Sequence, residues 1–397
     1  MRHAMRPSIL AVATIAVCAP LAAQQQDLLV QCKTLVVAPD ATVESGEFLV
    51  RDGKIAFVGG EIPAEAKARA TKVAFDGATV CAGMVLAHAT FDLERELAER
   101  AVALTPDMLA KDAFDPADEK LSRLPRYGIT AAALSPSSTN VAGGIAAVVE
   151  PGSLVDAAKK FGVVRKDDCY AKFSLISAAR NPERQPTSLM GAVDLLRNAF
   201  AEARSGVLAG PEAVAFNAVA RGERKAVFHA ESRAEILATL LLCKPIGIEP
   251  VIAGATDASE CLDEIAAARA SLLLPSLSPE ARDTQLQLPA ALEKRGVAFC
   301  FVGEPAGLRS SAALAVQHGC SRQTALAAVT TTPASLFGLA ATHGSLRNGS
   351  DADFAVWSGD PLDLTSRLIA VYGDGTLLFG AVPSPAKAAK AAKKEPN

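Results

Sequence analysis

The stretch KAVFHAESRAEILATLLLCKPIGIEPVIAG, residues 225–254, contains two short apolar runs separated by a longer patterned segment. The runs KAVFHA and EPVIAG are typical of buried strands. The segment from Arg233 to Gly247 has apolar residues at the i, i+3, i+4 and i+7 spacing of an amphipathic helix. A strand, a helix and a second strand in this order predict two parallel strands with the helix packed across them.

The same alternation continues on both sides of this stretch. Further apolar runs are predicted as buried strands, and further amphipathic segments as helices; the runs are 128–135, 270–276 and 296–303, and the segments 188–204 and 258–270. Roughly 250 residues of such units favour a barrel over an open sheet. The predicted fold is therefore α/β, with a (β/α)8 TIM-type barrel at 82–344.

Both flanks of this region have β character. Residues 27–81 alternate short apolar runs with turns, and Asp52-Gly53 predicts a tight hairpin. Residues 345–380 return to short apolar runs after two predicted helices. We expect one small β-sandwich domain built from both ends of the chain, 27–81 and 345–380.

The two termini differ from the rest of the sequence. Residues 1–26 place Arg2 and Arg6 before a short apolar run and a small-residue step, which is the order of a secretory signal peptide, although a buried N-terminal helix is the alternative. Residues 381–397 are rich in lysine and alanine, and we expect this tail to be disordered. We expect the protein to be exported, to the periplasm or the extracellular space, and to have no membrane-spanning segment.

The composition of the chain argues against nucleic acid as a partner. The chain has 397 residues, a formal net charge of -3 and 5% aromatic residues, which gives no basic surface with stacking side chains for nucleic acid. Of eight cysteines, Cys18 lies in the predicted signal peptide. The remaining seven show no C-x-x-C spacing and are expected to be mostly small buried side chains, with one disulfide left open.

A single histidine stands out in GMVLAHATFDL, residues 83–93. In a strand, residues i and i+2 point to the same side, so a His-x-His pair would present two imidazoles to one metal. Here the partner of His88 is Thr90. The segment is a metal-binding strand, a reduced version of one, or a strand end with an ordinary histidine.

Taken together, these segments resemble the amidohydrolase superfamily, in particular its imidazolonepropionase-like secreted members. LVRDGKIAFVGG resembles the family's small sandwich domain, and DGATVCAGMVLAHATFDL resembles its entry to the barrel. The most specific similarity is TALAAVTTTPASLFGLAATHGSLRNGSDADFAVWSGDPL, which follows the family's final helix, its N/T-P-A step and its G-S-L-x-x-G-x-x-A-D motif. The similarity extends over nearly all of 27–380.

The resemblance implies a metal site at the carboxyl mouth of the barrel, where divalent metals activate water against amide-like C–N bonds. It places His88 on the first strand, His229 on the fifth and Glu304 after the eighth, with Glu304 also the catalytic acid-base. We expect one divalent metal, zinc, held weakly or not at all.

Several positions depart from the family pattern, and this is the reason for expecting weak binding. Thr90, Leu86 and Ala82 replace a histidine, an acid and a proline; the sixth-strand position falls on Gly254 or Ser259, and Arg180 stands near the bridging lysine or glutamate. His88 and His229 as inert strand-end residues, and Glu304 as a solvated loop charge, are the alternatives.

Other candidate groups have structural interpretations. His318 and His343 match no ligand position and are expected at the surface. The pair Asp351 and Asp353 is expected to pack the returning β segment. Ser135 and Ser137 lack the G-x-S-x-G context of a nucleophile, and Gly143-Gly144 has no phosphate-loop lysine after it.

Two functions remain. The first is a hydrolase of non-peptide, cyclic amide-like C–N bonds with metal-activated water. The second is a catalytically inactive homologue that binds a small molecule or a protein. Fold alone does not choose between them. A small-molecule substrate or ligand is the expected partner, and a homo-oligomer is left open.

Overall fold

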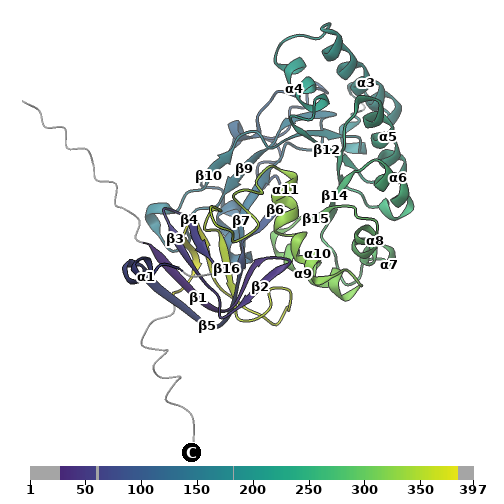
Figure 1. Ribbon diagram of the computed structural model, residues 1–397. Helices are drawn as coiled ribbons and strands as arrows, with labels where there is room; N and C mark the ends of the chain where they lie inside the picture. The colour runs from purple at the N-terminus through teal and green to yellow at the C-terminus, as the bar shows by residue number, and fades with distance from the viewer. Residues whose placement is uncertain (1–26, 60–61, 182, 383–397) are drawn as a thin grey trace, which may run out of the picture.

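The computed structural model describes residues 27–59, 62–181 and 183–382, and its described strands form three sheets. The predicted signal peptide and residues 383–397 of the predicted tail lie outside the described residues. Figure 1 shows strands from both chain ends gathered in one region, with most of the helices in the other. This arrangement separates a β part from an α/β part.

The first sheet has eight strands and contains both ends of the described chain. Its central contact is the antiparallel pairing of β5 with β16, which aligns Val80 with Val356. The strands are β1 (Leu28–Ala38), β2 (Ala41–Glu44), β3 (Glu47–Arg51), β4 (Lys54–Val58), β5 (Thr71–Ala82), β16 (Phe354–Trp357), β17 (Leu368–Gly373) and β18 (Thr376–Gly380). Purple and yellow strands therefore lie side by side in Figure 1.

The hairpin predicted at Asp52-Gly53 is confirmed. β3 and β4 pair antiparallel, with Arg51 opposite Lys54. Asp52 and Gly53 both have positive φ, 49° and 76°, the left-handed conformation that a two-residue turn of this type needs. Phe48, from the same hairpin, packs edge-on against Phe354 at a centroid distance of 5.1 Å. The hairpin is thus fixed to the returning β segment.

The α/β part is a ring of strands around an apolar centre. The strands predicted at 128–135, 225–230, 249–254, 270–276 and 296–303 are all present. The ring strands are β6 (Met84–Ala89), β7 (Ile129–Leu134), β8 (Ala142–Ile145), β9 (Ala147–Glu150), β11 (Tyr170–Ser174), β12 (Lys225–Ala230), β13 (Val251–Gly254), β14 (Ser271–Pro275) and β15 (Phe299–Val302), with β10 (Val163–Lys166) outside β9. Alternate residues such as Val251 and Ala253 face the same buried cluster as Cys300 and Val302.

The strand pairing of the described residues does not confirm the (β/α)8 barrel predicted from the sequence. β6 pairs parallel with β7, and β11 to β15 pair parallel in order. The segment β8–β9 joins the two groups by running antiparallel to both β7 and β11. No strand pairing joins β15 to β6 within the described residues. The described residues therefore form a mixed α/β fold, without strand pairing that would close the ring into a barrel.

A loop connects the two ring strands that do not pair. Val85 of β6 donates a backbone hydrogen bond to Val329, and Phe301 of β15 donates one to Ala328. The backbone between two late helices therefore takes up hydrogen-bonding groups that a neighbouring strand would otherwise satisfy.

The helices predicted at 188–204, 233–247 and 258–270 correspond to α3, α5 and α6. Ser188 caps α3 through the Gly191 N–H, and Ser232 with Glu235 forms a capping box at α5. The α-helices are α1 (Ala64–Arg69), α2 (Glu119–Arg123), α3 (Leu189–Ser205), α4 (Gly210–Ala220), α5 (Arg233–Cys243), α6 (Leu262–Ala267), α7 (Asp283–Leu286), α8 (Leu288–Lys294), α9 (Pro305–Gln317), α10 (Arg322–Ala327) and α11 (Thr331–Leu336).

The seven cysteines of the described chain are free and buried, which confirms the prediction that they act as small core side chains. Burial raises the pKa of the Cys81 thiol to about 12. None of the helices within the described ranges is long and apolar enough to cross a membrane.

Candidate functional site

Three basic side chains approach one another at the mouth of the ring: His88 on β6, Lys172 on β11 and His229 on β12. Lys172 interacts electrostatically with both imidazoles, and the two imidazoles interact with each other. In barrels of parallel strands, side chains at the carboxyl ends of the strands form the active site. We call these three residues the mouth cluster.

Ser138 connects two members of the mouth cluster. The Lys172 ammonium donates a hydrogen bond to Ser138 Oγ at 2.8 Å, and Ser138 Oγ lies 2.7 Å from His229 Nδ1. Because an ammonium has no acceptor, the serine oxygen accepts from Lys172 and its own proton is free to reach the imidazole. Tyr170 OH lies 3.4 Å from His88 Nδ1.

Burial lowers the pKa of every base in the mouth cluster. Lys172 is only 1% exposed, and loss of water around it lowers its pKa from 10.5 to about 7. Desolvation, with Lys172 as a nearby positive charge, lowers the pKa of His229 to about 3. The pKa of His88 falls well below its usual value for the same reasons, and His229 adds to the effect. The mouth therefore disfavours positive charge.

Glu304 is the third residue predicted for the metal site. It follows β15 as the residue before α9, and its side chain is exposed. It lines a pocket of about 460 Å³ together with His88 and Thr90. Glu304 and His88 thus share a pocket, whereas His229 and Lys172 do not line it.

One group of described side chains has the spacing of metal ligands, and it lies away from the mouth cluster. Across the described residues, a single group of three His, Cys, Asp or Glu side chains brings ligand atoms within 4.8 Å of one another, and it includes neither histidine of the mouth nor Glu304. The positive charge of Lys172 beside both imidazoles also opposes a cation there. The metal site predicted at the mouth stays a prediction, and we assign no chemical step to a metal at this place.

The space at the end of the sixth predicted barrel strand is already filled. Gly254 ends β13 with a φ of +88°, and a Cβ at this position would lie 2.9 Å from His229 Nε2. The His229 ring therefore occupies the volume that a side chain at Gly254 would need. Ser259, the alternative position, lies in a short 3-10 turn after the strand.

The group that does bring ligand atoms together is Glu150, His343 and Asp353, and all three are buried. We call it the junction cluster, because Glu150 ends β9 of the ring and Asp353 precedes β16 of the eight-stranded sheet. His343 is 2% exposed, so its predicted surface location is wrong. Its pKa is raised, because the Glu150 and Asp353 carboxylates around it outweigh its burial.

Sequence reasoning missed Lys172, Ser138 and the burial of His343. Arg180, considered near the bridging position, instead pairs with Glu235 at 2.8 Å. A signal for Lys172 was present: one lysine in the apolar run YAKFS is unusual, since lysine is seldom fully buried without a partner.

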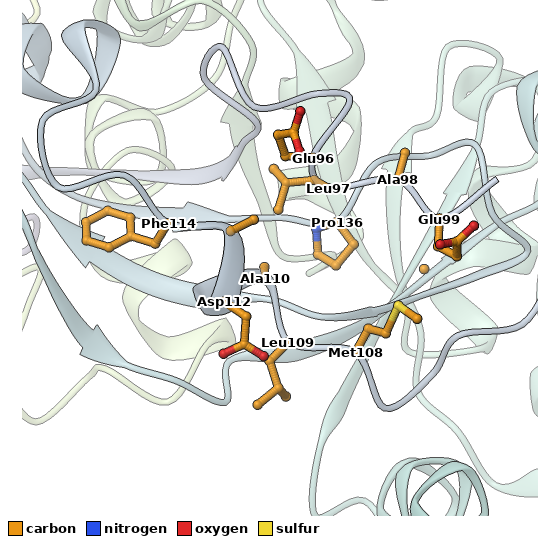
Figure 2. A pocket seen from close by; sticks show the side chains of 12 residues that line it. Glu96, Leu97, Ala98, Glu99, Met108, Leu109, Ala110, Asp112, Phe114 and Pro136 are labelled. Atoms are coloured by element: carbon orange, nitrogen blue, oxygen red, sulfur yellow. The ribbon is translucent and has the colours of Figure 1, made fainter.

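A larger pocket of about 560 Å³ lies elsewhere, along the segment 96–114 (Figure 2). Glu96, Glu99 and Asp112 give it an acidic border, and Pro136 lies between them. No residue of the mouth cluster lines this pocket. Size alone therefore does not make it the candidate site.

Comparisons with known proteins agree with the fold. A model of the amidohydrolase family matches residues 308–379. An amidohydrolase of Hapsidospora irregularis, tasK, is 40% identical over 68 residues, which is 17% of this chain and 7% of that protein. The chain thus spans a small part of that relative's length.

Solved structures extend the likeness over most of the chain. An amidohydrolase from Thermotoga maritima MSB8 has a TM-score of 0.78 at 24% identity, covering 89% of this chain and 100% of its own. A putative prolidase from Bifidobacterium longum has a TM-score of 0.56 at 15% identity, covering 93% and 98%. At these identities the likeness concerns the fold.

The mixed α/β ring, joined to a sheet made from both chain ends, has a fold similar to that of solved amidohydrolases. Residues 308–379 are thus similar to the amidohydrolase family, and the fold as a whole is similar to that of a solved amidohydrolase. The narrower assignment to imidazolonepropionase-like secreted members remains a prediction.

Proposed function

We propose that the protein hydrolyses C–N bonds of small, non-peptide, cyclic amide-like compounds at the mouth cluster. The observation that carries this proposal is the convergence of His88, Lys172 and His229, with Ser138 between two of them. Neutral bases in a water-poor site can take a proton from an attacking water, whose oxygen bonds to the carbonyl carbon. The C–N bond then breaks, and the leaving nitrogen takes up a proton.

The test is a hydrolysis screen on lactams, hydantoins and dihydropyrimidines, measured by loss of the ring amide absorbance. Lys172→Met should lower kcat by roughly 10² or more, since general acid-base groups contribute about that much. The matched control is Lys225→Met, an exposed lysine on the neighbouring strand β12. Equal activity in the two variants would remove the mouth cluster from the reaction.

A second candidate function is a catalytically inactive homologue that binds a small ligand or a protein. Thr90 and Gly254 favour it, because both stand where the family resemblance expects histidines. Under this proposal, calorimetry detects binding of one of the same ring amides with no turnover. Turnover lost in Lys172→Met would decide for the enzyme.

We also propose that the protein is exported, on the basis of residues 1–26. Mass spectrometry of protein recovered from the periplasm or medium should show a chain beginning near residue 27. An intact Met1 in that fraction would contradict export by signal cleavage.

A further inference from the structure

The junction cluster lies at the opposite end of the ring strands from the mouth. β9 runs antiparallel to β7, with Leu134 opposite Ala147 and Ala132 opposite Val149. Glu150, the next residue, therefore lies toward the amino end of β7, whereas the mouth is at the carboxyl ends. The two clusters are separate sites.

Two carboxylates converge on one imidazole nitrogen. His343 Nε2 lies 3.0 Å from Glu150 Oε1 and 3.3 Å from Asp353 Oδ2. A protonated Nε2 carries one hydrogen, which can point well at only one of the two oxygens. Ligands about 2.0–2.1 Å from a tetrahedral zinc ion are themselves roughly 3.3 Å apart. His343 Nε2 thus lies at about this separation from each carboxylate oxygen, and the ligand atoms of all three residues lie within 4.8 Å of one another.

The other nitrogen of His343 has a partner that orients the ring. Nδ1 lies 2.8 Å from Thr342 Oγ1. When Nδ1 donates to that hydroxyl, the Nε2 lone pair faces the two carboxylates. Histidines that bind metals usually donate their second N–H to a neighbouring group in this way, which fixes the tautomer and ring orientation.

The charge around the cluster leaves room for a cation. Glu150 and Asp353 lie among further carboxylates, of which Asp351 is 1% exposed. Arg165 contacts Glu150, Asp351 and Asp374, and Lys54 contacts Asp351 at 2.5 Å. Three buried carboxylates, those of Glu150, Asp351 and Asp353, therefore lie around two paired cations, and a neutral His343 leaves one negative charge in excess. A buried excess of negative charge is unfavourable unless a proton or a metal compensates it.

An independent feature also indicates a ligand. A pocket of about 390 Å³ is lined by Glu150, Asp353 and Thr130. Thr130 is 2% exposed, and its hydroxyl has no hydrogen-bond partner among the described residues. Buried hydroxyls are normally satisfied by protein or ordered water.

We propose that Glu150, His343 and Asp353 bind one divalent transition-metal ion, zinc or manganese, in a structural site. One imidazole and two carboxylates suit these metals. The ion connects β9 of the ring, the loop that carries His343 and the start of β16, so it fastens the ring to the eight-stranded sheet. This site is independent of the hydrolase function proposed for the mouth.

The test measures metal content and thermal stability of the full chain after loading with zinc chloride or manganese chloride and desalting. Wild type should retain about one ion per chain and gain melting temperature with occupancy. The double variant His88→Ala/His229→Ala should retain the same amount. Asp353→Asn should lose at least about tenfold in affinity, because a ligand charge is removed.

The matched control is Asp351→Asn. It removes a neighbouring buried carboxylate that lies 3.9 Å from His343 Nδ1, on the side away from the proposed ion. This variant should still bind the ion. Equal loss in Asp351→Asn and Asp353→Asn would show that general negative charge, not a ligand set, attracts metal, and would overturn the proposal.

Anomalous X-ray scattering at the metal edge of wild-type crystals gives an answer that does not depend on folding of the variants. A peak bonded to His343 Nε2 supports the site. A peak at the mouth alone, or no peak after loading, overturns it, and the cluster is then a network of ion pairs.

Discussion

The two ends of the strand ring show opposite consequences of burial. At the mouth, burial lowers the pKa values of Lys172 and His229 to about 7 and about 3. At the junction, acids predominate: burial raises the pKa of Asp353, and acidic neighbours raise the pKa of His343. A divalent cation is therefore expected at the junction and opposed at the mouth.

Removing the His343 imidazole from the junction cluster should cause the largest loss of unfolding free energy. His343→Ala leaves Glu150 and Asp353 buried without the group between them, and breaking such a buried network costs roughly 3–5 kcal/mol. Urea unfolding of the variant should show this loss. His318→Ala is the control, since no ion pair of His318 occurs in the described chain. A loss below about 1 kcal/mol would mean that the junction is not a coupled network.

Lys172→Met should produce the next largest change in unfolding free energy. We expect this change to be stabilising, and its size should depend on pH. The pKa of Lys172 is about 7 in the folded protein and 10.5 as its reference value, so between these pH values the unfolded chain binds more protons. Wild-type stability should then rise with pH, by roughly 1.4 kcal/mol per unit at most. Lys172→Met lacks this pH-dependent contribution, because methionine does not titrate.

Unfolding free energies at pH 6 and pH 10 measure the difference. We compare the unfolding free energy of Lys172→Met with that of wild type at each pH. This difference should favour the variant by about 3 kcal/mol more at pH 6 than at pH 10. Relaxation around the lysine makes the effect smaller than the pKa shift alone would give. Lys225→Met should show no such pH dependence. A flat difference for Lys172→Met would mean that the mouth accommodates the ammonium without cost.

The strands and helices could be predicted because their signals are local. The runs at 225–230 and 270–276 are apolar and short, and the helix from Arg233 has a regular apolar spacing and a capping box. The break between β15 and β6 could not be predicted. It depends on Val329 and Ala328, distant in sequence from β6, taking hydrogen bonds that a neighbouring strand would accept.

The site was predicted less completely than the fold, because motif reasoning follows single residue types. His88 and His229 were identified, but Lys172 was not, since a lysine is usually read as a surface residue. The burial of His343 depends on Glu150, which is 193 residues away in the sequence. Convergence over such separations follows from the assembled sheets, not from local spacing.

Gly254→Ala should have a smaller effect that concerns the mouth alone. Its φ of +88° disfavours any side chain, and the added methyl carbon would lie 2.9 Å from His229 Nε2. We expect a loss of about 2 kcal/mol in unfolding free energy and a displaced His229 ring in a crystal structure. Gly247→Ala is the control, because it has a similar φ of +85° and open space around it. If both variants lose the same stability, contact with His229 contributes nothing.

The smallest expected effect is the gain of metal binding on Thr90→His, which would restore a His-x-His pair with His88. The added imidazole supplies a ligand, but the Lys172 ammonium still repels a cation beside both histidines. We therefore expect a gain in zinc affinity of no more than about tenfold, or about 1.4 kcal/mol, measured by thermal shift in a chain whose junction is disabled by Asp353→Asn. Thr90→His combined with Lys172→Met should gain more zinc affinity than either change alone, because the second change removes the repulsion.

If the double variant gains no zinc affinity, His88 and His229 are too poorly oriented to bind one ion together. In that case GMVLAHATFDL is a strand end with an ordinary histidine, and the contrast between the two ends of the ring rests on the junction alone.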